Sequence, residues 1–148
     1  MSRWILLDTG PLGMLARRKP DPSITLWMRV ATATGARMAI PEIADYELRR
    51  ELLRAGIAGS VAVLDGLAGL LNYLPITTPV LRQAAVFWAD LRQHGRSTAS
   101  PDALDGDVIL AAQAHLLIAS GHSVVVATAN VGHLGRMIPA QQWDTITG

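Results

Sequence analysis

Acidic side chains occur at three separated places in this sequence where they could serve as ligands for a divalent cation. Asp8 directly follows the apolar run 4–7, Glu47 lies inside a predicted helix, and the acids of segment 102–107 precede another apolar helix. Hard divalent cations such as Mg²⁺ prefer carboxylate oxygens and keep several of their own water molecules. These residues therefore permit a cation site, provided that the fold brings the three places together.

Each of these acids also has an ordinary structural explanation. Asp8 could cap a helix that begins at Thr9, and Glu47 could belong to a solvated stripe in which acids pair with arginines. Acids in segment 102–107 are favoured by the dipole of the helix that follows, and one or two would suffice for that purpose. The segment holds three, namely Asp102, Asp105 and Asp107. This excess raises the weight of the cation hypothesis.

A neutral candidate ligand follows the clearest strand pattern of the chain, residues 124–128. Asn130 lies just past that strand, although taken alone it is better explained as a turn residue. His133 comes shortly afterwards, but the four histidines show no HExxH or other transition-metal spacing. We therefore expect His133 to pack or to form hydrogen bonds rather than to bind a metal.

Several other chemistries lack their motifs. The chain has no GxGxxG or GxxxxGK[ST] loop, no GxSxG elbow and no cysteine. The formal net charge of the 148 residues is +1, so any nucleic-acid contact must come from local basic patches. The most apolar stretch, residues 108–119, is too short to cross a bilayer, so we expect no membrane insertion. The absence of cysteine fits a reducing cytoplasm.

Apolar runs bounded by turn residues predict strands that alternate with helices. The predicted strands span residues 4–7, 37–40, 73–77, 124–128 and, as a last edge strand, 143–146. The predicted helices span residues 9–19, 25–33, 42–55, 60–72, 79–91 and 101–119, with a polar loop over 95–100. The alternation predicts a single α/β domain over residues 1–148, in which helices flank both faces of a parallel, twisted central sheet in three layers.

Ligands in such sheets bind at the carboxyl ends of the strands. Asp8 ends the first predicted strand, and Asn130 lies just past the late strand at 124–128. Both residues are therefore placed where an α/β protein of this kind puts its ligands.

Taken in order, these motifs resemble the PIN-domain family, and within it the VapC-like toxins of toxin–antitoxin pairs. Residues 7–12 (LDTGPL) look like the family's opening strand with its first acid, and residues 44–48 (ADYEL) look like the helix that carries the second. Residues 107–114 (DVILAAQA) are similar to the segment of the third acid. Residues 128–130 (TAN) resemble a threonine-bearing motif whose fourth position is Asp or Asn. The resemblance covers most of the chain.

The resemblance implies a PIN-like fold and a ribonuclease that depends on Mg²⁺ or Mn²⁺. It makes Asp8, Glu47 and Asp107 the expected metal ligands. Asp105 and Asn130 remain alternatives for a weaker ligand or a water-orienting group. A metal held in this way would lower the pKa of a bound water and orient it for attack on phosphorus.

An acidic site repels RNA unless a metal is present and basic residues flank it, so arginines near the acids are expected to contact the substrate. Thr9 could bind phosphate or simply cap its helix, while Arg50 and Arg54 are expected to contact RNA. Weaker basic candidates are Arg17, Arg18, Lys19, Arg49 and Arg96. The family further implies a homodimer and a cognate antitoxin protein.

Two other functions remain open at this point. The first is a PIN-like module with a weakened or inactive site that binds RNA or protein, a hypothesis motivated by the neutral Asn130 and by Leu134 and Met137 where the family usually has an aromatic residue. The second is a flap-type DNA nuclease. The short chain, without an inserted arch or helix-hairpin-helix, argues against that second function.

Overall fold

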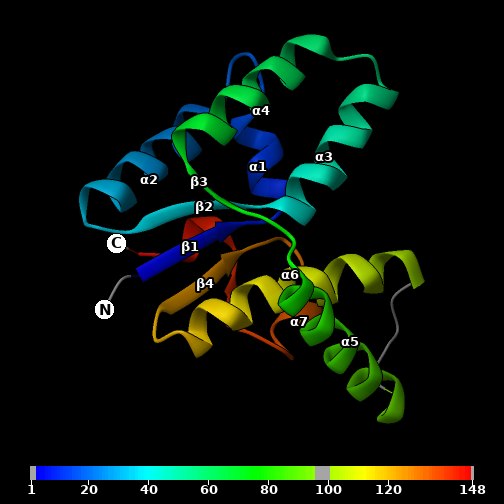
Figure 1. Ribbon diagram of the computed structural model, residues 1–148. Helices are drawn as coiled ribbons and strands as arrows, with labels where there is room; N and C mark the ends of the chain where they lie inside the picture. The colour runs from blue at the N-terminus through cyan, green and yellow to red at the C-terminus, as the bar shows by residue number, and fades with distance from the viewer. Residues whose placement is uncertain (1–2, 96–100, 148) are drawn as a thin grey trace.

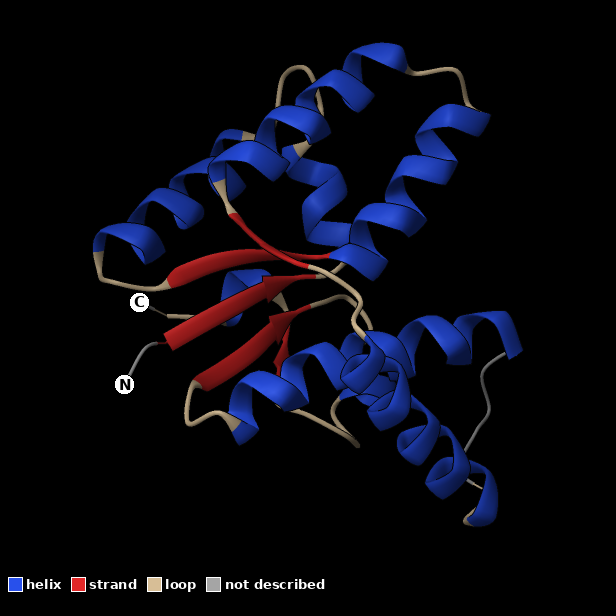
Figure 2. Cartoon of the chain, viewed as in Figure 1, coloured by secondary structure: helices blue, strands red, loops and turns tan. Residues whose placement is uncertain are grey.

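The computed structural model describes residues 3–95 and 101–147, and the centre of this part of the chain is a five-stranded sheet (Figures 1 and 2). In spatial order the strands are β3, β2, β1, β4 and β5, and every neighbouring pair is parallel. Along the chain their bounds are β1 Arg3–Leu7, β2 Arg37–Pro41, β3 Asn72–Leu74, β4 Ser123–Ala127 and β5 Ala140–Gln141. The predicted α/β class with a parallel central sheet is confirmed.

Helices connect the strands, and local sequence signals explain where several of them begin. Asp21 caps α2 and Thr77 caps α5, each by accepting a hydrogen bond from a backbone N–H in the first turn. The bounds are α1 Thr9–Leu15, α2 Pro22–Ala33, α3 Glu42–Arg54, α4 Ala58–Leu70, α5 Thr78–Gln93, α6 Pro101–Ala119, α7 Val131–Leu134 and the 3-10 helix η1 Trp143–Thr145.

The helices cover both faces of the sheet, with α1 to α4 on one side and α5 to α7 on the other (Figure 1). Successive side chains of a strand point to opposite faces. In β1, Ile5 and Leu7 therefore enter the core beneath α1 to α4, whereas Trp4 and Leu6 enter the core against α6. This alternation produces the three layers that the sequence predicts.

The edge strand predicted over residues 143–146 is wrong, because residues 143–145 form η1 and the edge strand is β5. Trp143 contacts Trp27 of α2 edge to face, with ring centroids 5.7 Å apart, and Ile146 is buried. The indole N–H of Trp27 also donates to the carbonyl oxygen of Ile146 at 3.1 Å. The alternation of apolar and polar residues here serves a turn that packs on α2, and a run this short cannot be distinguished from a strand by periodicity.

Smaller differences concern the ends of elements. The third strand ends at Leu74 rather than at residue 77, since Pro75 has no N–H to donate to a neighbouring strand. The helix predicted over 60–72 is α4, Ala58–Leu70, and the helix predicted over 9–19 ends at Leu15. The predicted polar loop falls largely on residues 96–100, outside the described residues. Within the described parts of the chain, no helix is long and apolar enough to cross a membrane.

The parallel arrangement places the ends of β1, β2 and β4 at one edge of the sheet. Asp8 follows β1, Glu42 begins α3 directly after β2, and Thr128 follows β4. The backbone N–H of Asp8 donates to the carbonyl oxygen of Ala127 at 3.0 Å, which fixes the ends of β1 and β4 side by side. We call this the carboxyl edge, and it positions the candidate site.

Candidate functional site

Asp8 is held at the carboxyl edge by hydrogen bonds to both of its carboxylate oxygens. Its Oδ1 accepts the backbone N–H of Thr9 at 2.7 Å, and its Oδ2 accepts the hydroxyl of Thr128 at 2.7 Å. The first bond caps α1, so capping and a role in a site are compatible for this residue. The second bond fixes the direction in which the carboxylate faces.

Glu47 approaches Asp8 from α3. Its Oε1 accepts the hydroxyl of Thr9 at 3.2 Å. Burial raises the pKa of Glu47, the Thr9 hydrogen bond opposes this effect, and the nearby charge of Asp8 raises the pKa further. On its other side the backbone of α6 comes close, since a Cβ added at Gly106 would lie 2.5 Å from Oε2. Glu47 is therefore enclosed between α1 and α6.

Asp107 completes the group of acids from the first turns of α6. It is half-buried, and its pKa is raised to about 6, first by burial and then by the charge of Asp8. Glu47 raises the pKa further, whereas His133 and a hydrogen bond from Asn130 lower it. The carboxylates of Asp8, which caps α1, of Glu47 on α3 and of Asp107 on α6 thus lie close enough for their charges to act on one another.

Asn130 is connected to the acids through two hydrogen bonds. Its Nδ2 donates to Oδ2 of Asp107 at 3.4 Å, and its backbone N–H donates to the hydroxyl oxygen of Thr128 at 2.9 Å. Because Thr128 in turn donates to Asp8, the segment after β4 contacts two of the three candidate ligands. We call Asp8, Glu47, Asp107 and Asn130 together the acidic site.

Asp105 lies apart from these residues. It is exposed and lines a groove between α5 and α6 with Leu81, Trp88 and Ile109. Residues two apart on an α-helix point about 200° away from each other, so Asp105 and Asp107 cannot face the same point. Of the two alternatives for the fourth position, the structure brings Asn130 to Asp107 and places Asp105 elsewhere.

The predicted arginines of α3 differ in their relation to the acidic site. Arg50 is half-exposed beside it, with its guanidinium 4.0 Å from Glu47 and stacked over the ring of Tyr46. Arg54 lies one turn further along and pairs with Glu51 at 2.8 Å. Arg50 is therefore the better placed of the two for a substrate at the site. Arg96 and the side chain of Asp102 lie outside the described part of the chain.

The acidic site can be tested for its fit to a divalent cation. Among the described residues, no three acidic or histidine side chains already lie as close together as the ligands of a metal would. Mg²⁺, however, binds through one or two carboxylates and keeps several waters. Burial is the main cause of the raised pKa of Asp107, and the charges of Asp8 and Glu47 add a repulsion that a cation among these acids would relieve. The donor set of carboxylate and amide oxygens therefore fits Mg²⁺ or Mn²⁺.

Two contributors to the site escaped the sequence analysis. Thr128 was noticed only as part of a motif, yet its hydroxyl is buried and binds Asp8. A polar residue directly after four buried strand residues is the signal that could have identified it. Gly106 lies between two acids, and only the structure reveals that it leaves room for Glu47.

Comparison with known proteins gives matches among solved structures. A chain of the DNA-bound VapBC structure from Salmonella typhimurium is similar with a TM-score of 0.73 and 23% sequence identity, over 97% of this chain and 99% of that chain. A chain of VapBC2 from Rickettsia felis, bound to a DNA fragment from their promoter, is similar with a TM-score of 0.73 and 18% sequence identity. The match covers 95% of this chain and 99% of that chain. A chain of VapBC-1 from nontypeable Haemophilus influenzae has a TM-score of 0.66 and 18% sequence identity, over 96% of this chain and 99% of that chain. No protein-family model and no curated protein sequence matches the chain.

At these identities the likeness concerns the fold. The chain has the PIN fold found in these VapBC structures, over nearly its whole length. The resemblance to VapC-like PIN domains that the sequence motifs indicate is thereby confirmed in the fold.

Proposed function

We propose that this chain is a VapC-like toxin that hydrolyses the phosphodiester bonds of RNA with the help of Mg²⁺ or Mn²⁺. The observation that carries the proposal is the convergence of three acids at the carboxyl edge of a PIN fold. Asp8, Glu47 and Asp107 come from distant parts of the sequence, and the pKa of Asp107 responds to the charges of both others. Helix capping alone does not explain why these three carboxylates lie near one another.

The three acids would hold the cation. When bound, a divalent cation lowers the pKa of a coordinated water and offsets the charge that develops on the leaving oxygen. Asp8 contributes a carboxylate whose orientation is already set by Thr9 and Thr128. Loss of such a supporting hydrogen bond typically costs about 10- to 100-fold in metal affinity or activity.

Two further residues suit the approach of an RNA strand. Asn130 fixes the Asp107 carboxylate without adding another negative charge to a site that must admit a phosphodiester. Arg50 offers a guanidinium at the rim, where it can contact a phosphate through paired hydrogen bonds. Thr9 donates its hydroxyl to Glu47, and we propose that this contact, in preference to one with phosphate, is its role at the site.

We further propose a cognate antitoxin, a homodimer and a cytoplasmic location. The similar structures are VapBC complexes, and two of them are bound to DNA, which supports an antitoxin partner. Large apolar side chains that stay exposed support protein contacts of this kind. Among the described residues they include Leu26, Val30, Leu53, Leu70, Leu81 and Trp88.

The alternative is a PIN-like module that binds RNA or protein without cleaving it. The neutral Asn130 and the loose spacing of the acids among the described residues favour this alternative. It predicts RNA binding without turnover under every metal condition.

Cleavage of RNA by the purified protein separates the two functions. With Mg²⁺ or Mn²⁺ we expect cleavage that stops on chelation and falls by at least about 100-fold in Asp8→Asn. Asp144→Asn, which neutralises an exposed acid of η1, serves as the charge-matched control and should retain cleavage. Unchanged cleavage by Asp8→Asn would contradict the proposed site, and RNA binding without any cleavage would establish the alternative.

A further inference from the structure

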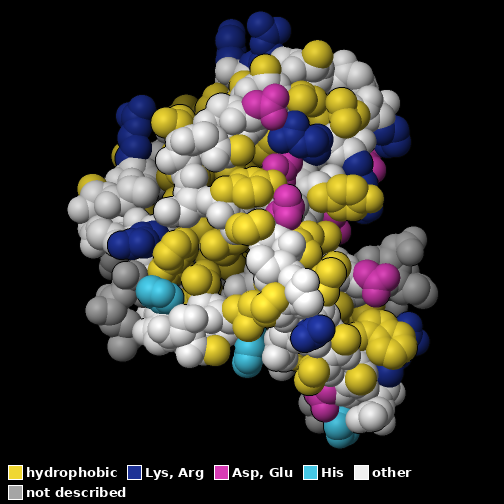
Figure 3. All heavy atoms as spheres, in the orientation of Figure 1, with side chains coloured by type: hydrophobic (Ala, Val, Ile, Leu, Met, Phe, Trp, Pro, Cys, Tyr) yellow, Lys and Arg dark blue, Asp and Glu magenta, His cyan; other side chains and the backbone are white. Residues whose placement is uncertain are grey.

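Helix α3 carries a second polar face that takes no part in the acidic site. Glu42, Asp45 and Arg49 follow one another at intervals of three and four residues, so they lie along one side of the helix. We call these three residues the α3 stripe. Figure 3 shows acidic and basic side chains gathered in this region, between α3 and α4.

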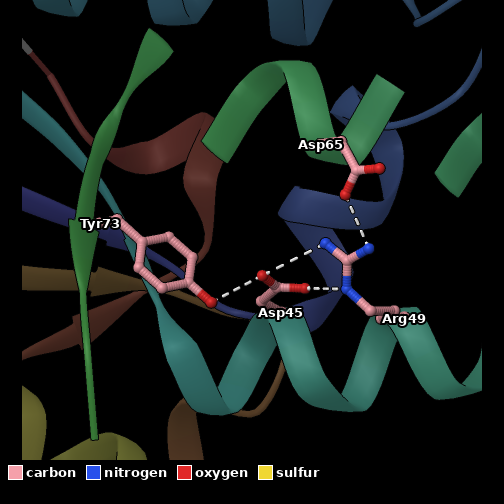
Figure 4. Close-up of polar contacts among 4 residues, drawn as sticks. All are labelled: Asp45, Arg49, Asp65 and Tyr73. Carbon is pink, nitrogen blue, oxygen red and sulfur yellow. Dashed lines mark hydrogen bonds and ion pairs between the residues drawn. The ribbon is translucent and has the colours of Figure 1, made fainter. Parts of the chain in front are cut away.

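At the centre of the α3 stripe lies the buried carboxylate of Asp45, which accepts hydrogen bonds from two side chains. Asp45 is only 6% exposed, and it accepts the hydroxyl of Tyr73 at 2.7 Å and the Nε–H of Arg49 at 2.9 Å (Figure 4). The same guanidinium donates from Nη1 to Asp65 at 2.7 Å. Asp45 and Arg49 thus bind α3 to β3 through Tyr73 and to α4 through Asp65.

A third contact lies at the start of the helix. Oε1 of Glu42 accepts the backbone N–H of Ile76 at 2.7 Å, in the connection between β3 and α5. The α3 stripe is therefore anchored at three levels along the helix axis. Hydrogen bonds of fixed direction at three levels resist both rotation and sliding of a helix, which apolar packing alone resists less well.

The opposite side of α3 carries Glu47. Asp45 and Glu47 are two residues apart and so point about 200° away from each other. Glu47 meets Thr9 and the backbone at Gly106, while the stripe holds the other side of the helix. Because the residues of a helix turn together, contacts that fix α3 on the side of the stripe also bear on where the Glu47 carboxylate lies.

The chemistry of the stripe favours positioning over stability. A buried ion pair is often no more stable than apolar residues of the same size, since both charges lose their hydration. Burial and the hydrogen bond to Asp45 raise the pKa of Tyr73, so its phenol keeps the proton that it donates at any ordinary pH. The bond from Tyr73 to Asp45 is therefore a constant constraint and no switch.

We infer that Asp45, Arg49 and Tyr73 are positioning residues that set the place of Glu47 in the acidic site. The inference rests on the proposed function insofar as Glu47 is a metal ligand. Arg49, a weak candidate for RNA contact on the basis of the sequence, is instead occupied by two acids of this network.

The first test follows the surroundings of Glu47 by NMR without any metal. Tyr73→Phe removes one hydroxyl from the network, and we expect the amide resonances of Thr9 and Gly106 to shift. Ile24→Val, which trims a buried side chain of α2, is the control for general destabilisation and should leave both resonances in place. Unshifted Thr9 and Gly106 amides in Tyr73→Phe would overturn the inference.

The second test is a double-mutant cycle read as Mn²⁺ affinity. We expect Tyr73→Phe to weaken Mn²⁺ binding about 10-fold in the wild-type background and not at all beside Glu47→Gln. An equal loss in both backgrounds would overturn the inference, because Tyr73 would then act independently of Glu47. If the wild-type protein binds no Mn²⁺, the proposed function fails, and the amide resonances still decide whether Tyr73 positions Glu47.

Discussion

The hydroxyl of Thr128 donates to Oδ2 of Asp8 at 2.7 Å and thereby joins the ends of β4 and β1, 120 residues apart in the sequence. The same hydroxyl oxygen accepts the backbone N–H of Asn130 at 2.9 Å. Thr128 is 1% exposed, so both hydrogen bonds of its hydroxyl are shielded from solvent. One buried hydroxyl therefore orients the first candidate ligand and fixes the turn that carries Asn130.

Removal of this hydroxyl should damage both the fold and the site. Thr128→Val leaves Asp8 and the Asn130 N–H without their buried partner, and we expect a loss of about 1–2 kcal/mol in the free energy of unfolding. RNA cleavage should fall by about 10-fold, as for other supporting contacts of metal ligands. Urea unfolding and a cleavage assay measure the two effects. Thr128→Ser keeps the hydroxyl and should retain most of the stability and most of the cleavage activity. A fully active Thr128→Val would show that the hydroxyl does not orient Asp8.

The close approach of α6 to Glu47 makes a second prediction. In Gly106→Ala the new Cβ would lie 2.5 Å from Oε2 of Glu47, so the carboxylate must move. We expect cleavage to drop by more than about 10-fold, because a displaced ligand loses its geometry. The matched control is Gly66→Ala in α4, where the Cβ meets open space. That control should remain active and gain about 0.5–1 kcal/mol of stability, and equal activity of the two variants would exclude the proposed crowding.

The raised pKa of Asp107 predicts how stability depends on pH. The folded state holds this proton up to a pKa of about 6, compared with 3.8 for a free side chain. The contribution of the protonated group to stability is therefore complete below about pH 4 and is lost as the pH rises through about 6. The ionised carboxylate consequently weakens the metal-free fold at neutral pH.

Asp107→Asn isolates this effect. At pH 7.5 we expect the variant to be more stable than the wild type by about 1 kcal/mol, a value well below direct conversion of the shift because the group is partly exposed. At pH 4 the two proteins should be equally stable. Thermal unfolding in the presence of a chelator across this range provides the measurement. A constant difference at all pH values would show that Asp107 does not titrate as described.

The fourth position of the acidic site can be assigned by comparing two variants. Asn130→Ala removes the amide that contacts Asp107, and we expect cleavage to fall by about 10-fold or more. Asp105→Asn changes an exposed side chain in the groove of α5 and α6, and we expect less than a twofold change at saturating metal. A larger loss of cleavage in Asp105→Asn than in Asn130→Ala would assign the fourth position to Asp105.

The sequence predicted the fold from local signals, whereas Asp8, Glu47 and Asp107 became candidates through the order of motifs that resemble the PIN-domain family. Apolar runs of three or four residues marked β1, β2 and β4, and a parallel sheet places whatever follows them at one edge. The choice between Asp105 and Asn130 depended on the rotation of α6 about its axis, which the largely apolar sequence after Asp107 does not determine. The role of Gly106 depends on the distance between α3 and α6, which is a property of tertiary packing alone. η1 escaped prediction since Trp143 packs on Trp27 of α2 and the carbonyl oxygen of Ile146 accepts the Trp27 indole N–H, more than a hundred residues away in the chain.

The central claim, that Asp8, Glu47 and Asp107 converge to hold a divalent cation, is tested most directly by a crystal structure of the protein soaked in Mn²⁺. We predict an anomalous peak coordinated by carboxylate oxygens of Asp8 and Asp107, with Glu47 bound directly or through a water, and no such peak in crystals of Asp8→Asn. Crystals of active protein that show no Mn²⁺ among these residues, or that show it bound elsewhere, would contradict the claim.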